Sequence, residues 1–284
     1  MEPWRIVFIS MVQPAVANVD AYARSIGHET LAVVTTPGKQ GRATELQEQG
    51  VERFRNLVEN APPHLDVLIA SDKSRLAPLI RPLEPDVIFS MGFPWLLPKE
   101  VIEIPRLGIV NGHPSLLPRY RGPIPLAWAF RNGDRELGMS WHLMDEHFDT
   151  GPVLAQGSVP IDDEDQLEDL FPKLGVLSSQ LLPQVFERLA GGERGQPQPP
   201  SDEPYAGFFE DDYVHVDWAR PAREIHNQVR AWRGGPIAGG IRGPIAELDG
   251  EQLRLLRTSL KPQAGAREAQ AGDGPLWVLE TEPA

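Results

Sequence analysis

The chain has 284 residues, a formal net charge of −13 at pH 7 and no cysteine. The lack of cysteine excludes disulfides, thiolate zinc sites and thiol nucleophiles, and it accords with the cytoplasmic location that we expect. No apolar run reaches the roughly 18 residues that a membrane-spanning helix requires, and the first residues lack the pattern of a secretory signal. We therefore expect no membrane association.

Short apolar runs rich in β-branched residues alternate with polar or helical stretches through the first half of the chain. This alternation predicts an α/β domain with a doubly wound, mostly parallel sheet. The first expected strand is followed by Met-Val-Gln-Pro instead of Gly-x-Gly-x-x-Gly, so we expect no dinucleotide cofactor. The expected strands are residues 5–10, 31–36, 67–70, 85–90 and 107–110.

Asn111 and His113 follow the last of these apolar runs. Ligands of doubly wound folds bind beyond the carboxyl ends of the strands, and residues two apart in an extended chain point to one side. Asp149 comes later, where chain reversals can return it to the same place. Each residue alone is more often a turn former or a cap. Together, an amide donor, an imidazole and a carboxylate are the groups that acyl-type transfer needs around an oxyanion.

The pattern around these residues is Asn-x-His-x-Ser-Leu-Leu-Pro-x-x-x-Gly over residues 111–122, followed by Asp-Thr-Gly at 149–151. It resembles the signature of the folate-dependent formyltransferases, which include methionyl-tRNA formyltransferases and sugar and other small-molecule N-formyltransferases. The resemblance implies a Rossmann-like catalytic domain and 10-formyltetrahydrofolate as a consumed co-substrate, without a metal. It also implies that Asn111, His113 and Asp149 are the catalytic residues.

The same resemblance implies which residues bind the folate and support the site. His147 departs from the family pattern, which often has Gly at that position. For the apolar loop at 93–98 the alternative to folate binding is ordinary packing under the site. Arg119 and Arg121 could contact an anionic acceptor or the folate tail, and the alternative for them is solvated surface. The expected folate-binding residues are Met91, Phe93, Trp95, Leu96, Asp145, Glu146 and Phe148. The expected substrate or support residues are Ser115, Arg119 and Gly122.

Composition divides the chain into a catalytic domain at 1–190, a proline-rich linker at 191–204 and a small domain at 205–284. Apolar spacing predicts a helix over 163–189, with an irregularity at Pro172 and a kink or break at Pro183. The last domain resembles the small β-barrel-like domain of methionyl-tRNA formyltransferases. Within it we expect strands at 244–256 and 275–280, and a loose loop at 261–273.

Charge is the main argument about the acceptor. From residue 205 onward the chain has nine basic and twelve acidic residues, whereas nucleic-acid surfaces normally need clustered Lys and Arg. The stretch at 39–43, where tRNA-formylating relatives carry a long basic loop, has only Lys39 and Arg42. We therefore expect a small-molecule amine acceptor, such as an amino sugar, an amino acid or a specialised metabolite, and we disfavour tRNA. The sequence leaves the oligomeric state open.

Other functions remain as alternatives. Methionyl-tRNA formylation, hydrolysis of formyltetrahydrofolate and a non-catalytic folate-binding role are all compatible with the motif. A metal site made by His142, His147 and Asp149 lacks a further ligand at suitable spacing, so we expect none. A hydrolase triad with Ser115 as the nucleophile is disfavoured because no Gly-x-Ser-x-Gly motif is present.

Overall fold

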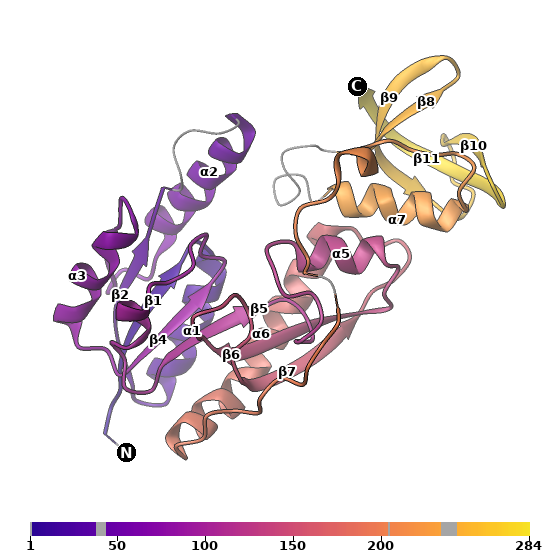
Figure 1. Ribbon diagram of the computed structural model, residues 1–284. Coiled ribbons are helices and arrows are strands. Elements are labelled where there is room, and N and C mark those ends of the chain that lie inside the picture. The colour runs from indigo at the N-terminus through magenta and orange to yellow at the C-terminus, as the bar shows by residue number, and fades with distance from the viewer. Residues whose placement is uncertain (1, 38–43, 204, 234–242) are drawn as a thin grey trace. The chain divides into compact units, whose positions relative to one another are not determined.

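The computed structural model describes residues 2–37, 44–203, 205–233 and 243–284. The chain forms two compact units (Figure 1). The first consists of Met1–Arg121, Gly138–Ser158 and Leu174–Glu203, and the second of Gly122–Leu137, Val159–Lys173 and Pro204–Ala284. Among the described residues, no helix is both long and apolar enough to cross a membrane.

A seven-stranded sheet is the centre of the first unit, with strand order β3-β2-β1-β4-β5-β6-β7. The neighbours from β3 to β5 are parallel, whereas β6 runs antiparallel to β5. The predicted α/β fold with a mostly parallel sheet is therefore confirmed. The strands are β1 (Arg5–Ser10), β2 (Glu29–Thr35), β3 (Asp66–Ile69), β4 (Val87–Met91), β5 (Ile109–His113), β6 (Glu136–Leu143) and β7 (Val153–Pro160).

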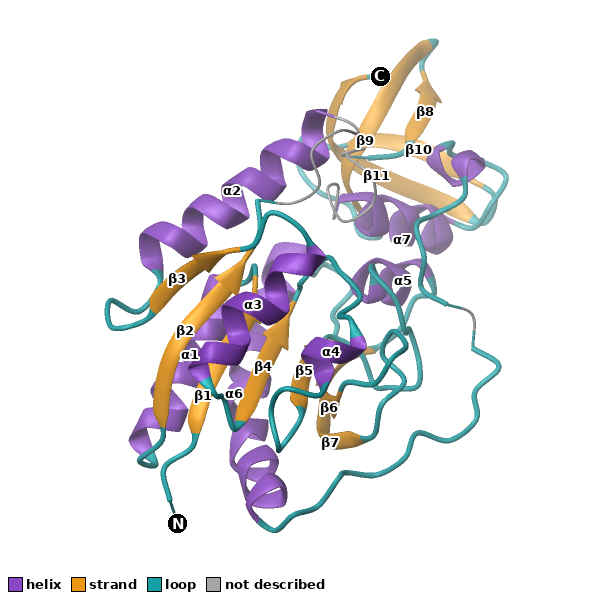
Figure 2. Ribbon diagram, turned by 60° about the vertical axis from the view of Figure 1, so that its left-hand side comes forward, coloured by secondary structure: helices purple, strands orange, loops and turns teal. Residues whose placement is uncertain are grey.

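Helices cover both faces of this sheet, as Figure 2 shows. On one face, Phe186 stacks on Phe89 of β4 with ring centroids 5.3 Å apart. On the other face, a buried cluster joins Leu76 and Val101 to strand residues such as Ile109. Burial on both faces explains why the strands are continuous apolar runs. The helices of the unit are α1 (Gln13–Ser25), α2 (Thr44–Asn60), α3 (Leu76–Ile80), α4 (Lys99–Ile102) and α6 (Leu167–Ala190), with 3₁₀ turns at Lys73–Arg75 and Arg81–Leu83. Residues 167–173 of α6 belong to the second unit.

Helix α6 continues through both of its prolines, so the break expected at Pro183 is wrong. A proline in a helix interior costs about 3 kcal/mol through a lost hydrogen bond and a steric clash. Fully burying one leucine or phenylalanine side chain stabilises a fold by about 1.5–3 kcal/mol. The helix buries a long apolar face that offsets the proline cost, made by Leu170, Leu174, Leu177, Leu182, Val185, Phe186 and Leu189.

The second unit contains a four-stranded antiparallel sheet with strand order β10-β11-β9-β8. Ile225 and Val229 of helix α7 (Ala222–Arg233) are fully buried in the apolar clusters that line this sheet. Helix α5 (Pro125–Arg131) and a 3₁₀ turn at Asp211–Val214 belong to the same unit. The strands are β8 (Ile245–Leu248), β9 (Glu251–Ser259), β10 (Arg267–Ala271) and β11 (Gly274–Pro283).

Strand β10 lies inside the segment 261–273 that we expected to be a loose loop, so that expectation is wrong for its second half. Ala269 and Ala271 are buried, whereas Glu268 and Gln270 are exposed. This is the alternation of a half-buried strand. The apolar positions are alanines, whose small side chains make the alternation hard to recognise in the sequence.

Candidate active site

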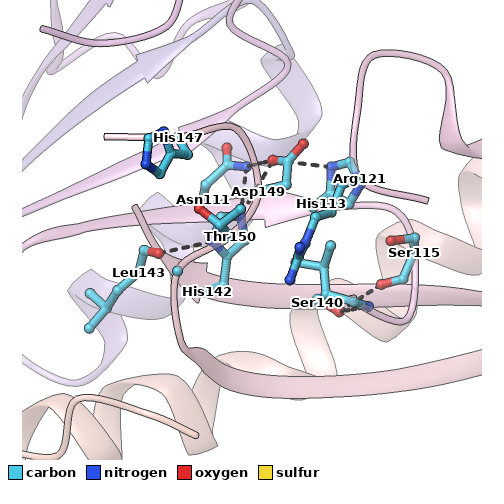
Figure 3. A network of polar contacts seen from close by, with 12 residues as sticks. Asn111, His113, Ser115, Arg121, Ser140, His142, Leu143, His147, Asp149 and Thr150 are labelled. Carbon is cyan, nitrogen blue, oxygen red and sulfur yellow. Dashed lines mark hydrogen bonds and ion pairs between the residues drawn. The ribbon is translucent and has the colours of Figure 1, made fainter. Parts of the chain in front are cut away.

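Two elements of the first unit bring the predicted catalytic residues together (Figure 3). Asn111 and His113 lie two residues apart on β5 and point to the same side of the sheet. Asp149 lies in the turn between β6 and β7. The side chains of Asn111 and His113 point toward the Asp149 carboxylate, as the motif predicts.

The ring nitrogens of His113 have different partners. Nε2 lies 2.8 Å from the carbonyl oxygen of Tyr120, which can only accept, so Nε2 carries a proton and donates it. Nδ1 faces Asp149 Oδ1 at 3.6 Å. Burial lowers the pKa of His113 below its ordinary value, although the Asp149 charge opposes the shift. The resting ring is therefore neutral near pH 7, and Nδ1 is the nitrogen that can take up or give a proton.

Asp149 is held in an uncommon backbone conformation. Its φ is 56°, in the left-handed region that non-glycine residues rarely adopt. Such conformations cost about 1–3 kcal/mol and persist where surrounding contacts hold them, often at functional sites. The Oδ1 atom lies 3.5 Å from Asn111 Nδ2 and 3.6 Å from both His113 Nδ1 and His142 Nε2. One carboxylate oxygen therefore faces three nitrogen-bearing side chains.

Gln198 holds the Asp149 turn from the proline-rich segment. Its Nε2 donates to the carbonyl oxygens of Asp149 and Gly151, each at 2.8 Å. Its Oε1 accepts from Nε and Nη2 of Arg121 at 3.0 and 2.6 Å. Nearby, the backbone of Gln196 pairs with that of Val153. Arg121, which we considered as a possible anion contact, instead orients the Gln198 amide that holds the Asp149 turn.

Gln198→Ala is expected to lower turnover about tenfold with little effect on the fold, because it removes hydrogen bonds worth about 0.5–1.5 kcal/mol each from the Asp149 turn. The measurement is kcat for formyl transfer, with thermal unfolding to confirm folding. Gln252→Ala, at an exposed glutamine of β9, is the matched control. Equal turnover in Gln198→Ala and wild type would show that the Asp149 turn keeps its geometry without this clamp.

Glycines allow two close approaches beside these residues. A Cβ at Gly151 would overlap the carbonyl oxygen of Leu143, so the glycine of the Asp-Thr-Gly motif lets the turn close on β6. A Cβ at Gly112, between Asn111 and His113 on β5, would overlap the terminal methyl of Met91. Met91, one of the expected folate-binding residues, therefore packs directly beneath β5.

The loop after β4 contains the other expected folate residues of this region. Trp95 is buried in the core beneath the loop, and the Phe93 ring contacts it edge to face, with ring centroids 5.3 Å apart. Leu96 is half-buried, whereas Gly92 and Pro94 are exposed. Contacts from this loop to a ligand would come from its backbone and from Phe93 and Leu96, with Trp95 as the anchor.

The turn after β6 contains the remaining expected folate residues. Asp145 Oδ1 accepts from the backbone amide of His147 at 2.9 Å and from Thr150 Oγ1 at 2.6 Å, which closes the turn. Glu146 is exposed and pairs with Lys99 at 3.1 Å. Phe148 is 46% exposed, which is unusual for a large apolar side chain and leaves its ring available to a ligand.

The expected support residues have structural contacts. Ser115 is buried, and its Oγ donates to the carbonyl oxygen of Arg119 at 2.7 Å, which holds the turn after His113. The Arg119 guanidinium lies over the Tyr120 ring and 3.9 Å from Glu203. Gly122, in the second unit, has φ of 126°, and a Cβ there would overlap the Ala206 backbone. Within the described ranges, no cluster of three or more His, Cys, Asp or Glu is arranged to hold a metal.

The contacts of Gln198 and His142 were not expected from the sequence. Gln198 was assigned to a linker, and no local pattern connects it with the Asp149 turn. We considered His142 only as a metal ligand, but it lies directly opposite Asn111 in the β5–β6 pairing. Side chains along β6 alternate between the two faces of the sheet, so His142 lies on the same face as Asn111, the residue opposite it. That alternation is the signal that predicts the contact once the two strands are paired.

Relatives with curated names cover most of the chain. It is 39% identical over 246 residues to a methionyl-tRNA formyltransferase of Pelobacter propionicus, covering 84% of this chain and 73% of that protein. It is 33% identical over 297 residues to a methionyl-tRNA formyltransferase of Trichlorobacter lovleyi, covering 100% of this chain and 91% of that protein.

These relatives contradict our expectation of a small-molecule acceptor with tRNA disfavoured. The expectation rested on net charge, which sums the whole surface, whereas a nucleic acid contacts only part of it. An acidic protein can therefore bind tRNA through a local basic region. The stretch with Lys39 and Arg42, our second argument, lies outside the residues that the structure describes.

A solved structure shares the fold of this chain, and a family profile shows its family. The fold is similar to that of HypX from Aquifex aeolicus in complex with tetrahydrofolic acid, with a TM-score of 0.66 and 18% identity. The match covers 99% of this chain but only 44% of HypX, so this chain spans less than half of that protein. The profile described as Formyl transferase matches residues 5–186, which include every catalytic candidate. The chain belongs to the formyltransferase family and is a formyl-transferring enzyme.

Proposed function

We propose that this protein transfers the formyl group of 10-formyltetrahydrofolate to the amino group of methionyl-tRNA. The observation that supports methionyl-tRNA as the acceptor is the match over most of the chain to relatives named methionyl-tRNA formyltransferase. The match includes the second unit, beyond the catalytic residues. A charged tRNA as the acceptor also accords with a cytoplasmic location.

The donor supplies the formyl group and leaves as tetrahydrofolate. We propose that it is held by the loop after β4 and the turn after β6, which contain the expected folate residues. A ring ligand needs apolar walls with a few backbone polar groups. Phe93, Leu96 and the exposed Phe148 ring supply such walls, and the exposed backbone around Gly92 supplies polar groups.

Asn111 would stabilise the negative charge that develops on the formyl oxygen as the amine attacks the formyl carbon, and His113 would add to this once its Nδ1 has taken up a proton. The Asn111 amide has one N–H directed to His142 Nε2 at 3.1 Å, and the other makes only a long contact of 3.5 Å to Asp149. The second N–H can turn to a substrate oxygen at little cost, because a 3.5 Å contact is weak. Preorganised donors of this kind typically contribute about a hundredfold to a thousandfold in rate.

Asp149 and His113 would manage the protons. The attacking amine loses a proton when the new C–N bond forms, and the folate nitrogen needs one when its bond to the formyl carbon breaks. The Asp149 carboxylate can accept the first, directly or through water, and Nδ1 of His113 lies 3.6 Å away to share it. The Tyr120 carbonyl keeps Nε2 engaged, so the proton moves only on the Nδ1 side of the ring.

The acceptor is tested by comparing methionyl-tRNA with free amines, including amino sugars and methionine, at several salt concentrations. We expect formylation of methionyl-tRNA at a kcat/KM far above that of any free amine. The apparent affinity should fall steeply with salt, because each neutralised phosphate adds about 0.7–0.9 to the log–log slope. Preference for a free amine, or a flat salt dependence with tRNA, would contradict the proposal.

A further inference from the structure

His142 is a buried histidine beside Asn111 and Asp149. The formyl transfer proposed above gives it no role. His142 lies on β6 opposite Asn111 of β5, and only 1% of its surface is exposed. Residues directly opposite in an antiparallel pair have side chains on the same face, about 4.5–5.5 Å apart at Cβ. The register therefore places an imidazole against the Asn111 amide, and Figure 3 shows the two side by side.

The contacts of His142 define its tautomer. Nδ1 lies 2.9 Å from the carbonyl oxygen of Leu143, which can only accept, so Nδ1 carries the proton. In the neutral ring, Nε2 is then an acceptor. Its neighbour at 3.1 Å is Nδ2 of Asn111, a donor. The Leu143 peptide is itself fixed, because its N–H donates to Pro152 and its carbonyl packs against Gly151.

An asparagine amide has two nearly isosteric ends with opposite roles, since the NH₂ group donates and the oxygen accepts. Rotation of the Asn111 side chain by half a turn would place its oxygen where a donor is needed, against the developing negative charge. Asp149 opposes that rotation only weakly, because its oxygen lies 3.5 Å away and also faces two imidazoles. The shorter contact is the one to His142.

We propose that His142 is a positioning residue: its unprotonated Nε2 accepts from Asn111 and holds the amide with its NH₂ group toward the reacting formyl oxygen. The proposal rests on the proposed formyl transfer. It assigns His142 no contact with the substrate and no proton transfer, because its only free lone pair is used by Asn111.

The first test compares His142→Leu with His142→Gln, measuring kcat and KM with methionyl-tRNA and 10-formyltetrahydrofolate. Leucine cannot accept a hydrogen bond, whereas the glutamine oxygen can replace Nε2. We expect His142→Leu to lower kcat at least about tenfold with KM nearly unchanged, and His142→Gln to stay within about threefold of wild type. His215→Leu, at an exposed histidine, is the control. Wild-type kcat in folded His142→Leu, or equal losses in the leucine and glutamine variants, would overturn the proposal.

The second test asks whether His142 acts through Asn111. In an Asn111→Ala background, His142→Leu should have almost no further effect on kcat, because the group that His142 positions is gone. Additive losses would overturn the proposal.

A third measurement is independent of activity. Nitrogen-15 NMR of the histidine rings should show His142 protonated at Nδ1 only. A ring protonated at Nε2 would contradict the proposal even if formyl transfer is confirmed, and wild-type protein without transferase activity would instead count against the proposed function.

Discussion

His113→Ala is expected to lower the turnover of formyl transfer at least about a hundredfold while the protein stays folded. The variant removes the imidazole whose Nδ1 faces Asp149 and whose Nε2 is anchored to Tyr120. Asn111→Ala removes the oxyanion donor and should have an effect of similar size. Asp149→Asn keeps the side-chain volume but removes the carboxylate that shares the proton, and we expect a comparable loss.

These effects are measured as kcat under saturating substrates, with circular dichroism to confirm the fold. His215→Ala, at an exposed histidine of the second unit, controls for loss of an imidazole as such. Near-normal turnover in folded His113→Ala would disprove the assignment of this residue to catalysis.

The second large effect concerns stability at acid pH. Burial lowers the pKa of His226 from 6.5 to about 4, and the charge of Arg230 adds to the shift. The unfolded chain therefore binds this proton before the folded chain does. The stability that the neutral His226 ring contributes is fully present above pH 6.5 and is lost as pH falls toward 4. We expect this one group to lower the free energy of unfolding by about 3 kcal/mol over that window.

The test is chemical unfolding of wild type and His226→Gln between pH 7 and pH 4. We expect the free energy of unfolding to depend less steeply on pH in His226→Gln than in wild type. Because only slopes are compared, a constant loss from the missing bonds to Thr258 and Asp163 does not affect the result. His215→Gln should keep the wild-type slope. Identical slopes in wild type and His226→Gln would show that His226 is not the acid-sensitive group.

The sequence predicts the sheet and the placement of the proposed catalytic residues because their signals are local. The apolar run before Asn111 predicts β5, and the two-residue spacing places Asn111 and His113 on one side. Contacts that depend on strand pairing or on distant segments leave no local signal. The antiparallel pairing of β5 with β6 puts His142 against Asn111, and Gln198 reaches Asp149 from the proline-rich segment.

The expectations for α6, β10 and the acceptor were wrong for a different reason. Prolines disfavour a helix locally and polar residues disfavour a buried strand, but the packing of α6 and β10 outweighs these local preferences. Net charge is a sum over the whole chain and does not report where Lys and Arg lie in space. The charge counts therefore described the chain correctly but gave the wrong acceptor.

The central claim is transfer of a formyl group to methionyl-tRNA at the Asn111, His113 and Asp149 site. It is tested most directly by a single-turnover reaction with excess protein, methionyl-tRNA and 10-formyltetrahydrofolate, in which both products are quantified. We expect formylmethionyl-tRNA and tetrahydrofolate to appear in equal amounts and at the same rate, and His113→Ala to slow both together. Release of tetrahydrofolate without formylation of the tRNA would contradict the account, because water would then be the acceptor.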